Sequence, residues 1–369
     1  MSVYINYIGT ANPEHKIAQK QIAKFMANAQ EMNEEERQKL SVLYRASAIQ
    51  TRYSALTDYG KQTASEHEFY PPNDTLEPFP TVGQRMQIYQ KEALPLCLTA
   101  IKNALSEDYD YTQVSHLVTV SCTGMYAPGI DIEIIQALGL PTSTQRTAIN
   151  FMGCYAAFNA IKTAYQIVKS NPNAQVIVVA VELCSLHFQK TKDADTLLAN
   201  ALFGDGSGAM LISGSQSEGL NLRLDRFYCD LAIQGKREMA WTINDFGFEM
   251  KLTAMVPEFI RSGIKELTDR LLSNINLGIS DVDYFAIHPG GKKILRVIEE
   301  ELGIERTANR FAHEVLREYG NMSSPTILFV LKNLLKQLSS RDQGKKVLSF
   351  AFGPGLTLES MLLTVTQRG

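Results

Sequence analysis

Residues 147–183 read TAINFMGCYAAFNAIKTAYQIVKSNPNAQVIVVAVEL, and this stretch decides the fold class. Residues 147–153 predict a β-strand, and residues 155–169 predict a helix because apolar side chains recur along one face. Residues 175–183 are apolar almost throughout, which is typical of a strand covered on both faces. This alternation of strand, helix and strand favours an α/β architecture with parallel or mixed sheets.

The same alternation continues on both sides of this stretch. Residues 114–122, VSHLVTVSC, predict another strand, and residues 130–138 predict a helix that ends at Gly139. The polar, proline-containing residues 66–82 predict a loop, and Pro95 is a candidate kink in the next helix. Further helices are expected over 14–29, 31–39, 83–105, 256–273, 291–302 and 322–338. Further strands are expected over 220–232, 284–288, 346–352 and 356–365.

An internal repeat divides the chain into two similar parts. Cys154 and Asn321 each follow a glycine and precede a helix and then an apolar strand. FGDG at 203–206 and FGPG at 352–355 each precede a further strand. The repeat predicts two duplicated α/β halves related by a pseudo-two-fold axis, with Cys154 and Asn321 facing each other from equivalent helix N-termini.

The junction between the halves is expected in the polar stretch SGSQSEG, residues 213–219. We therefore expect an N-terminal half, 1–215, that carries the cysteine. The C-terminal half, 216–369, would carry Asn321 and the histidine discussed below.

Composition excludes several classes of function. The chain has 369 residues, a net charge of −3 and 20% charged residues, so no strong basic field exists to hold nucleic acid or an anionic membrane. The N-terminal residues lack the basic and apolar regions of a secretory signal, and no apolar run reaches the length of a membrane span. A cytoplasmic protein is the resulting expectation.

The five cysteines, at positions 97, 122, 154, 184 and 229, are too few and too widely spaced for a disulfide framework or a zinc site. We expect no metal. Cys154 stands out because it opens a helix, where unpaired backbone N–H groups favour an anion and lower the pKa of a thiol. The alternative is a buried structural cysteine at a strand–helix turn.

Two further polar residues lie at the ends of predicted elements. His288 ends the strand YFAIH and precedes Pro289, Gly290 and Gly291, and strand ends of this kind are where α/β sites assemble. Asn321 precedes an apolar helix, where the alternative role is an N-cap. Together with Cys154 they supply a nucleophile, a base and a donor. Two donors aimed at a thioester oxygen would stabilise the enolate left by decarboxylation of a malonyl thioester.

At these residues the sequence resembles the chalcone synthase superfamily, the type III polyketide synthases, along nearly the whole chain. The motifs that carry the resemblance are IGTANP at 8–13, ALFGDGSGAML at 201–211, HPGGKKIL at 288–295, YGNMSS at 319–324 and FGPGLTLE at 352–359. Jointly they are specific, whereas the GDG turn alone would be weak.

The resemblance implies a thiolase-like, five-layered αβαβα fold and a homodimer. It implies acyl-CoA and malonyl-CoA as substrates, with no other cofactor. Cys154 would carry the growing chain, His288 would help keep it a thiolate, and His288 with Asn321 would promote decarboxylation. The backbone of the 352–355 loop, shaped by Gly353 and Gly355, would form an oxyanion hole with the Cys154 amide.

The resemblance also implies cavity residues. Phe203 corresponds to a gatekeeper, and a second gatekeeper falls at Met250 or Phe248, depending on the alignment. Further cavity positions are Cys122, Cys184, His187, Trp241 and Ser323. Cys122, Cys184 and His187 stand where plant enzymes have threonines, and Trp241 stands where they have glycine, so the cavity is reshaped. His187 is either a polar cavity group or a satisfied core histidine.

The basic helix expected to bind coenzyme A keeps Lys39, with Arg45 and Arg52 nearby, but Val42 and Ala46 stand at other basic positions of the family. This loss leaves open delivery of the starter by an acyl carrier protein. The alternative to phosphate binding is a solvated surface.

These features predict iterative decarboxylative condensation of malonyl-CoA onto a starter held on Cys154, followed by cyclisation to a pyrone, resorcinol or related aromatic product. One alternative is a single condensation like that of β-ketoacyl carrier protein synthase III. A second is a non-catalytic thiolase-fold protein that binds acyl groups. The starter, the number of extensions and the cyclisation mode depend on cavity shape, which side-chain packing decides.

Overall fold

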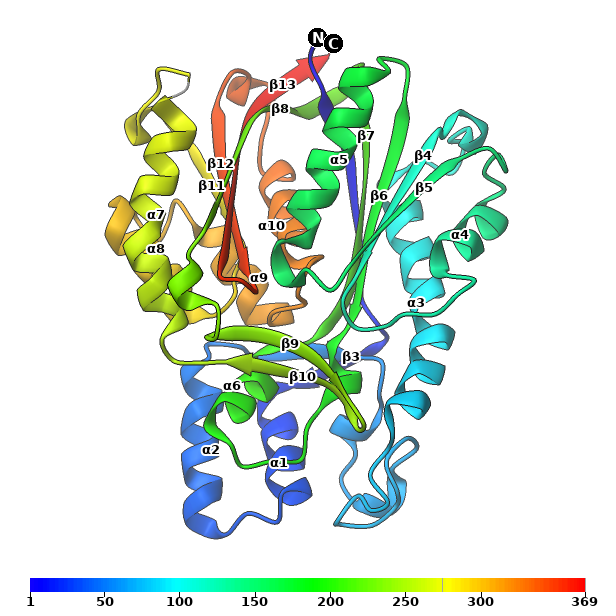
Figure 1. The fold of residues 1–369 in the computed structure, drawn as a ribbon, viewed down its shortest axis with the longest axis vertical. Coiled ribbons are helices and arrows are strands. Elements are labelled where there is room, and N and C mark those ends of the chain that lie inside the picture. Colours follow the sequence, from blue (N-terminus) through cyan, green and yellow to red (C-terminus); the bar gives the residue numbers. More distant parts are fainter. Residues whose placement is uncertain (274, 369) are drawn as a thin grey trace.

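The computed structural model describes residues 1–273 and 275–368, and its centre is a mixed sheet of nine strands (Figure 1). The strand order is β11-β12-β13-β8-β1-β7-β6-β4-β5. The bounds are β1 Tyr4–Ala11, β4 His116–Ser121, β5 Gln145–Asn150, β6 Gln175–Leu183, β7 Asp205–Ser213, β8 Gly219–Leu231, β11 Tyr284–Ile287, β12 Lys346–Gly353 and β13 Thr357–Arg368.

The sheet contains the same pattern of pairing twice. In the first half β4 and β6 are parallel, β7 is antiparallel to β6, and β1 is antiparallel to β7. In the second half β11 and β12 are parallel, β13 is antiparallel to β12, and β8 is antiparallel to β13. A short antiparallel pairing of β1 with β8 joins them. The duplicated halves predicted from the sequence repeat are therefore confirmed.

Alternating side chains divide the structure into layers. On β6, Val176 and Val178 pack into a central core, whereas Ile177 and Val179 pack into an outer one, as the period of a strand requires. The central core holds α5 (Ala156–Ser170) and α10 (Thr326–Leu335) between the two half-sheets. The outer cores hold α3 (Val82–Ala104) and α4 (Ile130–Leu138) on one side, and α7 (Val256–Ser273) and α8 (Lys292–Leu302) on the other. The α/β, five-layered, thiolase-like expectation is met.

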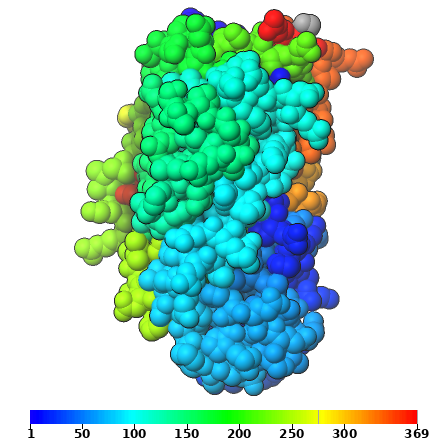
Figure 2. Space-filling view, turned by 90° about the vertical axis from the view of Figure 1, so that its right-hand side faces the viewer, coloured from blue at the N-terminus to red at the C-terminus, as the bar shows by residue number. Residues whose placement is uncertain are grey.

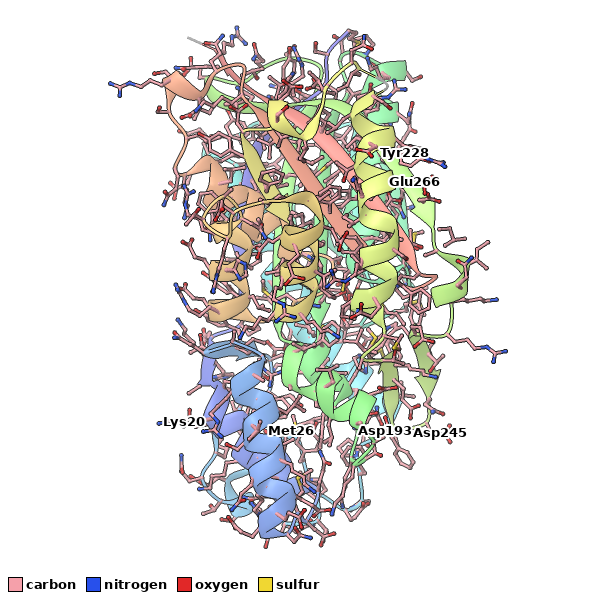
Figure 3. All side chains as sticks on the ribbon, turned by 90° about the vertical axis from the view of Figure 1, so that its left-hand side faces the viewer. Lys20, Met26, Asp193, Tyr228, Asp245 and Glu266 are labelled. Atoms are coloured by element: carbon pink, nitrogen blue, oxygen red, sulfur yellow. The ribbon has the colours of Figure 1, made fainter. Side chains whose placement is uncertain are left out.

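A lower layer of short elements covers the ends of the strands (Figure 1). It consists of β2 (His15–Ala18), α1 (Gln19–Ala29), α2 (Glu34–Ala46), β3 (Thr51–Ser54), α6 (Ala194–Leu202), β9 (Met239–Asn244) and β10 (Gly247–Leu252). Figure 3 shows Met26 in this layer, away from the main sheet. α9 (Arg310–Tyr319) packs against β3 and α10.

Several predicted boundaries need correction. The helix expected over 14–29 begins only at Gln19, because His15–Ala18 pair as a strand with Thr51–Ser54. The helix expected over 31–39 runs from Glu34 to Ala46, with Asn33 as its N-cap. The helix expected over 322–338 is Thr326–Leu335. α3 continues through Pro95.

Candidate active site

Cys154 lies in a short 3-10 turn, Gly153–Tyr155, that leads from β5 into α5. Gly153 has a φ of +77°, and a Cβ atom there would lie 2.5 Å from Cδ of Pro354. Only glycine fits, so the 352–355 loop packs directly on the turn that presents the cysteine. Gly353 is equally constrained, since a Cβ would lie 2.4 Å from the ring of Tyr155. These contacts agree with the expectation that glycines shape this loop.

Asn321 lies against Cys154 from the other half of the chain. The Cys154 Sγ atom is 3.8 Å from both Oδ1 and Nδ2 of the Asn321 amide. The backbone N–H of Ser323 donates to Oδ1 at 2.8 Å, and Nδ2 donates to the Gly290 carbonyl at 3.4 Å. The bond from Ser323 N–H fixes the orientation of the amide, so that its donor atom, Nδ2, lies beside Cys154 and can donate to a substrate.

Asn321 is not the N-cap of α10, which begins five residues later at Thr326. Its backbone bridges to the first half instead. The Asn321 N–H donates to the Leu202 carbonyl, and the Gly204 N–H donates to the Asn321 carbonyl, each at 2.9 Å. The expected equivalence of two helix N-termini is therefore wrong for Asn321, although the two side chains do face each other.

His288 follows β11 directly, and its N–H donates to the Phe350 carbonyl at 2.8 Å. The side chain is 1% exposed, and neither ring nitrogen has a hydrogen-bond partner among the described residues. Burial lowers the pKa of His288 to about 3, so the ring is neutral. An unsatisfied buried polar group costs about 1–3 kcal/mol, which a ligand could recover by bonding to it. Asn321 contacts the same turn through Gly290.

The pKa of Cys154 is shifted upward, whereas the sequence predicted a downward shift. Burial raises the pKa of this thiol to about 11, although hydrogen bonds with Ser323 and Asn321 act in the opposite sense. Removal from water disfavours the thiolate more than the local donors favour it. In the resting protein the Cys154 thiol is therefore protonated and the His288 imidazole is neutral. Such a thiol needs a general base when it attacks, and His288 is available for that role.

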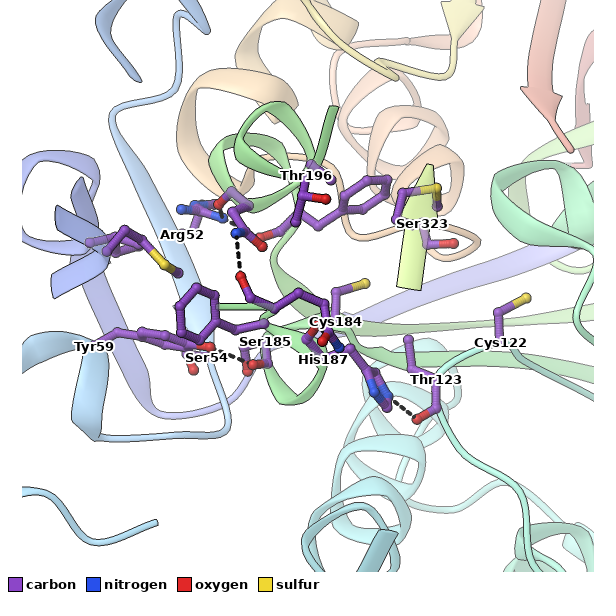
Figure 4. A pocket seen from close by; sticks show the side chains of 18 of the residues that line it. Arg52, Ser54, Tyr59, Cys122, Thr123, Cys184, Ser185, His187, Thr196 and Ser323 are labelled. Carbon is purple, nitrogen blue, oxygen red and sulfur yellow. Dashed lines mark hydrogen bonds between the residues drawn. The ribbon is translucent and has the colours of Figure 1, made fainter. Parts of the chain in front are cut away.

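A cavity opens beside these residues (Figure 4). The space between its walls, its opening to solvent included, amounts to about 770 Å³. The lining includes seven residues that the sequence placed in a cavity: Cys122, Cys184, His187, Phe203, Trp241, Met250 and Ser323. Gly353 and Gly355 are not part of this lining. Of the two alternative gatekeepers Met250 lines the cavity, whereas Phe248 is 2% exposed and packs behind it.

His187 serves both of the roles left open by the sequence. It lines the cavity, yet its ring nitrogens are satisfied by the protein. Phe248 N–H donates to Nδ1 at 3.0 Å, so Nε2 carries the proton and donates to the Thr123 carbonyl at 2.7 Å. Phe248 stacks on the imidazole with ring centroids 4.2 Å apart. Burial lowers the pKa of His187 to about 3, so it presents an uncharged face to the cavity.

Trp241 closes the cavity beside His187. Its Nε1–H donates to the Cys122 carbonyl at 2.6 Å, and its ring meets His187 edge-on with centroids 5.8 Å apart. Trp241 is opposite Met250 in the β9–β10 hairpin. The hairpin therefore places a large fixed ring in one wall of the cavity.

Glu182, at the end of β6, was missed by the sequence analysis. It is fully buried and accepts hydrogen bonds from Cys122 N–H, Thr123 Oγ1 and Ser324 Oγ at 2.7–2.9 Å. Burial is the main reason that its pKa rises to about 7. A carboxylate that ends an otherwise apolar strand was the available signal.

A second cavity lies on the other side of α6, against Gly290 and Gly291. Leu43 and Ala46 of α2 line it, and so do Lys292 and Lys293 at the start of α8. No ion pair joins Lys292 to any residue within the described part of the chain, whereas Lys293 is 3.3 Å from Glu258. α8 has no acidic residue in its first turn to neutralise its N-terminal end.

The basic residues expected to hold coenzyme A do not line this second cavity. Lys39 is exposed and pairs with Glu35 at 2.6 Å, and Arg45 is exposed on the same helix. Arg52 is wrong as a phosphate ligand, because its side chain is 4% exposed and donates to Gln19 and to the Asn200 and Phe203 carbonyls.

The described residues, 1–273 and 275–368, contain no helix with the length and apolar character required to cross a membrane.

Comparison with protein families gives two matches. The family model described as "Chalcone and stilbene synthases, N-terminal domain" matches residues 2–216, and its C-terminal counterpart matches residues 229–366. A relative from Mycobacterium tuberculosis, "Alpha-pyrone synthesis polyketide synthase-like Pks18", is 34% identical over 78% of this chain and 75% of its own length.

Solved structures agree over almost the whole chain. "PKS-I from the brown algae Ectocarpus siliculosus" superposes with a TM-score of 0.90 at 30% identity and covers 99% of both chains. The C-terminal type III polyketide synthase domain of "Steely1" from Dictyostelium superposes with a TM-score of 0.89 at 29% identity, again over 99% of both chains.

Proposed function

Because the chain belongs to the chalcone and stilbene synthase family, and is a carbon–carbon bond-forming acyltransferase of the type III polyketide synthase class, we propose that it extends an acyl starter on Cys154 with malonyl-CoA. The observation that carries this proposal is the Cys154–Asn321 contact beside a buried His288 whose two ring nitrogens lack partners. The reaction needs no cofactor beyond the thioester substrates.

In loading, the neutral His288 imidazole accepts the Cys154 proton as the sulfur attacks, because the raised pKa of Cys154 and the lowered pKa of His288 disfavour a separate proton transfer. The sulfur attacks the carbonyl of the starter thioester, and the coenzyme A thiol leaves with the returned proton. Backbone N–H groups of Cys154 and the 352–355 loop would hold the oxyanion. The closely packed Pro354 keeps that loop against the nucleophile turn.

Decarboxylation follows at the same donors. The bond between the malonyl carboxylate and its α-carbon breaks, CO₂ leaves, and the electron pair moves onto the thioester oxygen as an enolate. The N–H groups of His288 and Asn321 stabilise this charge in a site sheltered from water. The enolate carbon attacks the Cys154 thioester, and the sulfur leaves as a thiolate that accepts the next chain.

We propose a pyrone, resorcinol or related aromatic product. Support comes from the fixed Trp241 wall and from the relative whose name refers to α-pyrone synthesis. The test is mass spectrometry of products from purified enzyme, malonyl-CoA and a ladder of straight-chain acyl-CoA starters. Several malonyl units per product support the proposal. A single condensation that requires malonyl carrier protein would support the β-ketoacyl carrier protein synthase III alternative instead.

A non-catalytic, acyl-binding role is the second alternative. It lacks support in the geometry, because Cys154 and Asn321 contact each other and Asn321 also bonds to Gly290, in the turn that follows His288. Incubation with a radiolabelled acyl-CoA, followed by peptide mass spectrometry, distinguishes the two. An acyl group covalently bound to Cys154 fits an enzyme, whereas acyl-CoA that binds without acylating Cys154 favours a binding protein.

Coenzyme A thioesters are proposed to enter by the second cavity. Its apolar walls suit the pantetheine arm, and Lys292 and Lys293 stand where phosphates would lie. An acyl carrier protein remains an alternative source of the starter. Transfer of a radiolabelled acyl group to Cys154 from the CoA thioester, but not from the carrier-protein thioester, would exclude it.

A homodimer is proposed through β5. This strand ends the main sheet, and the side chains of Arg146, Thr147 and Ala148 are all exposed. The face that carries α4 and β5 is turned toward the viewer in Figure 2. An uncovered edge strand in a large sheet is a template for pairing with another chain, and pairing with a second copy would continue the sheet. Sedimentation velocity of wild type and Ala148→Pro tests this, because proline removes a ladder donor.

A further inference from the structure

The active-site cavity extends far beyond the nucleophile. Figure 4 shows Cys122 at one end of the cavity and Tyr59 at the other, with Cys184 between them. The far end lies under α1, where Ile22 and Met26 line it. This end belongs to the lower layer of the fold and contains none of the residues that carry the proposed chemistry.

The far end presents mainly carbon to the lumen. Ile22, Met26, Phe188 and Ala199 are apolar and buried. Two polar side chains at this end, Tyr59 and Arg52, form hydrogen bonds to the protein. Tyr59 Oη donates to the Ser185 carbonyl at 2.5 Å.

Arg52, which also lines this end, is anchored in the same way. Its Nε donates to Gln19 Oε1 at 2.8 Å, and Nη1 donates to the Asn200 carbonyl at 2.9 Å, whereas Nη2 has no hydrogen-bond partner among the described residues. A sugar, which needs several polar partners, would find this single free donor, whereas an aliphatic chain needs none.

The opposite direction is closed to a long chain. Trp241 is fixed by its bond to the Cys122 carbonyl, and His187 is fixed by bonds at both ring nitrogens. These side chains cannot swing aside without breaking hydrogen bonds. A chain held on Cys154 therefore has its apolar path along Cys184 toward α1.

We infer that the aliphatic tail of the starter runs along this path and that Met26, with Ile22, sets the longest starter accepted. This inference rests on the proposed function, because it concerns the acyl group that Cys154 would carry. Met26 is an end wall for the tail and takes no part in bond making.

The test uses Met26→Ala and a ladder of saturated acyl-CoA starters from butanoyl to hexadecanoyl. Truncation frees space for about two methylenes, each worth about 0.8 kcal/mol on burial. We expect kcat/KM to rise about tenfold for starters two carbons beyond the wild-type optimum, with no gain for shorter ones. Met32→Ala is the matched control, because Met32 lies in the same hydrophobic core but does not line the cavity.

Ala199→Leu provides an opposite variant, since it adds bulk to the same end of the cavity. It should lose activity with the longest wild-type starters and keep activity with the shortest. Thermal melting shows whether each variant is folded. If wild type forms no polyketide from any starter, the proposed function fails. If wild type is active and Met26→Ala and Ala199→Leu, both folded, keep the profile of Met32→Ala, the end-wall inference is overturned.

Discussion

The Sγ atom of Cys154 lies 3.8 Å from Nδ2 of Asn321, although 167 residues separate them in the chain. Two sets of contacts between the halves bring these side chains together. Gly153 lets the turn that carries Cys154 pack on Pro354, and the Asn321 backbone bridges to Leu202 and Gly204 of the other half. Each half thus holds a proposed catalytic residue of the other in place, so the site forms only when both halves are folded.

Cys154→Ala should abolish condensation and retain part of the malonyl-CoA decarboxylation, because the donors His288 and Asn321 remain. The measurement is CO₂ release from labelled malonyl-CoA alongside product analysis. Cys97→Ala is the control, since that cysteine is buried in an outer core. Unchanged polyketide formation by Cys154→Ala would refute the covalent role.

Asn321→Ala should lower kcat for both decarboxylation and condensation about 100- to 1,000-fold, the usual effect of removing one donor to a developing oxyanion. The buried Asn309, which bonds to Glu299 on the far side of α8, supplies the matched variant Asn309→Ala. Loss of activity in both variants with equal loss of Tm would indicate a folding defect rather than a missing donor.

Lys292→Ala/Lys293→Ala should raise KM for acyl-CoA about tenfold or more, because charge-assisted bonds to phosphate are worth about 1.5–3 kcal/mol. Turnover of N-acetylcysteamine thioesters, which carry no phosphate, should not change. Lys39→Ala/Arg45→Ala on α2 is the comparison pair. If that pair raises KM for acyl-CoA and the α8 pair does not, phosphate binding lies on α2.

Trp241→Gly should shift products toward additional malonyl units, because the indole occupies space that a growing chain could fill. Liquid chromatography with mass spectrometry of products from one starter gives the distribution. Phe246→Gly, at the exposed tip of the same hairpin, controls for loosening of β9 and β10. An unaltered product distribution with a folded Trp241→Gly enzyme would show that this wall does not limit extension.

The pH dependence of stability should report on Glu182. Its pKa rises from 4.5 to about 7 in the folded protein, so the folded state binds more protons than the unfolded state between those values. The free energy of unfolding of wild type should therefore fall, relative to Glu182→Gln, by about 3 kcal/mol as pH rises through this window. Urea unfolding of both proteins at a series of pH values measures it. If the free energies of unfolding of wild type and Glu182→Gln change with pH in parallel, the pKa of Glu182 is not raised in the folded protein.

The sequence determined the fold class and the chemistry. Alternating strands and helices, the two glycine-led turns and the FGDG and FGPG repeats suffice to indicate duplicated halves, since they reflect local periodicity and turn geometry. The types of Cys154, His288 and Asn321, and their places at element ends, indicated a nucleophile, a base and a donor.

Only the tertiary structure decided which way these groups face and how burial alters them. Met250 and Phe248 occupy the same face of β10, and the crossing of the hairpin over the cavity selected Met250. Arg52 resembles a phosphate ligand in sequence, yet long-range packing buries it. The pKa of Cys154 rises because the thiol is removed from water. That burial is produced by all the elements that surround the thiol, and no local sequence pattern predicts it.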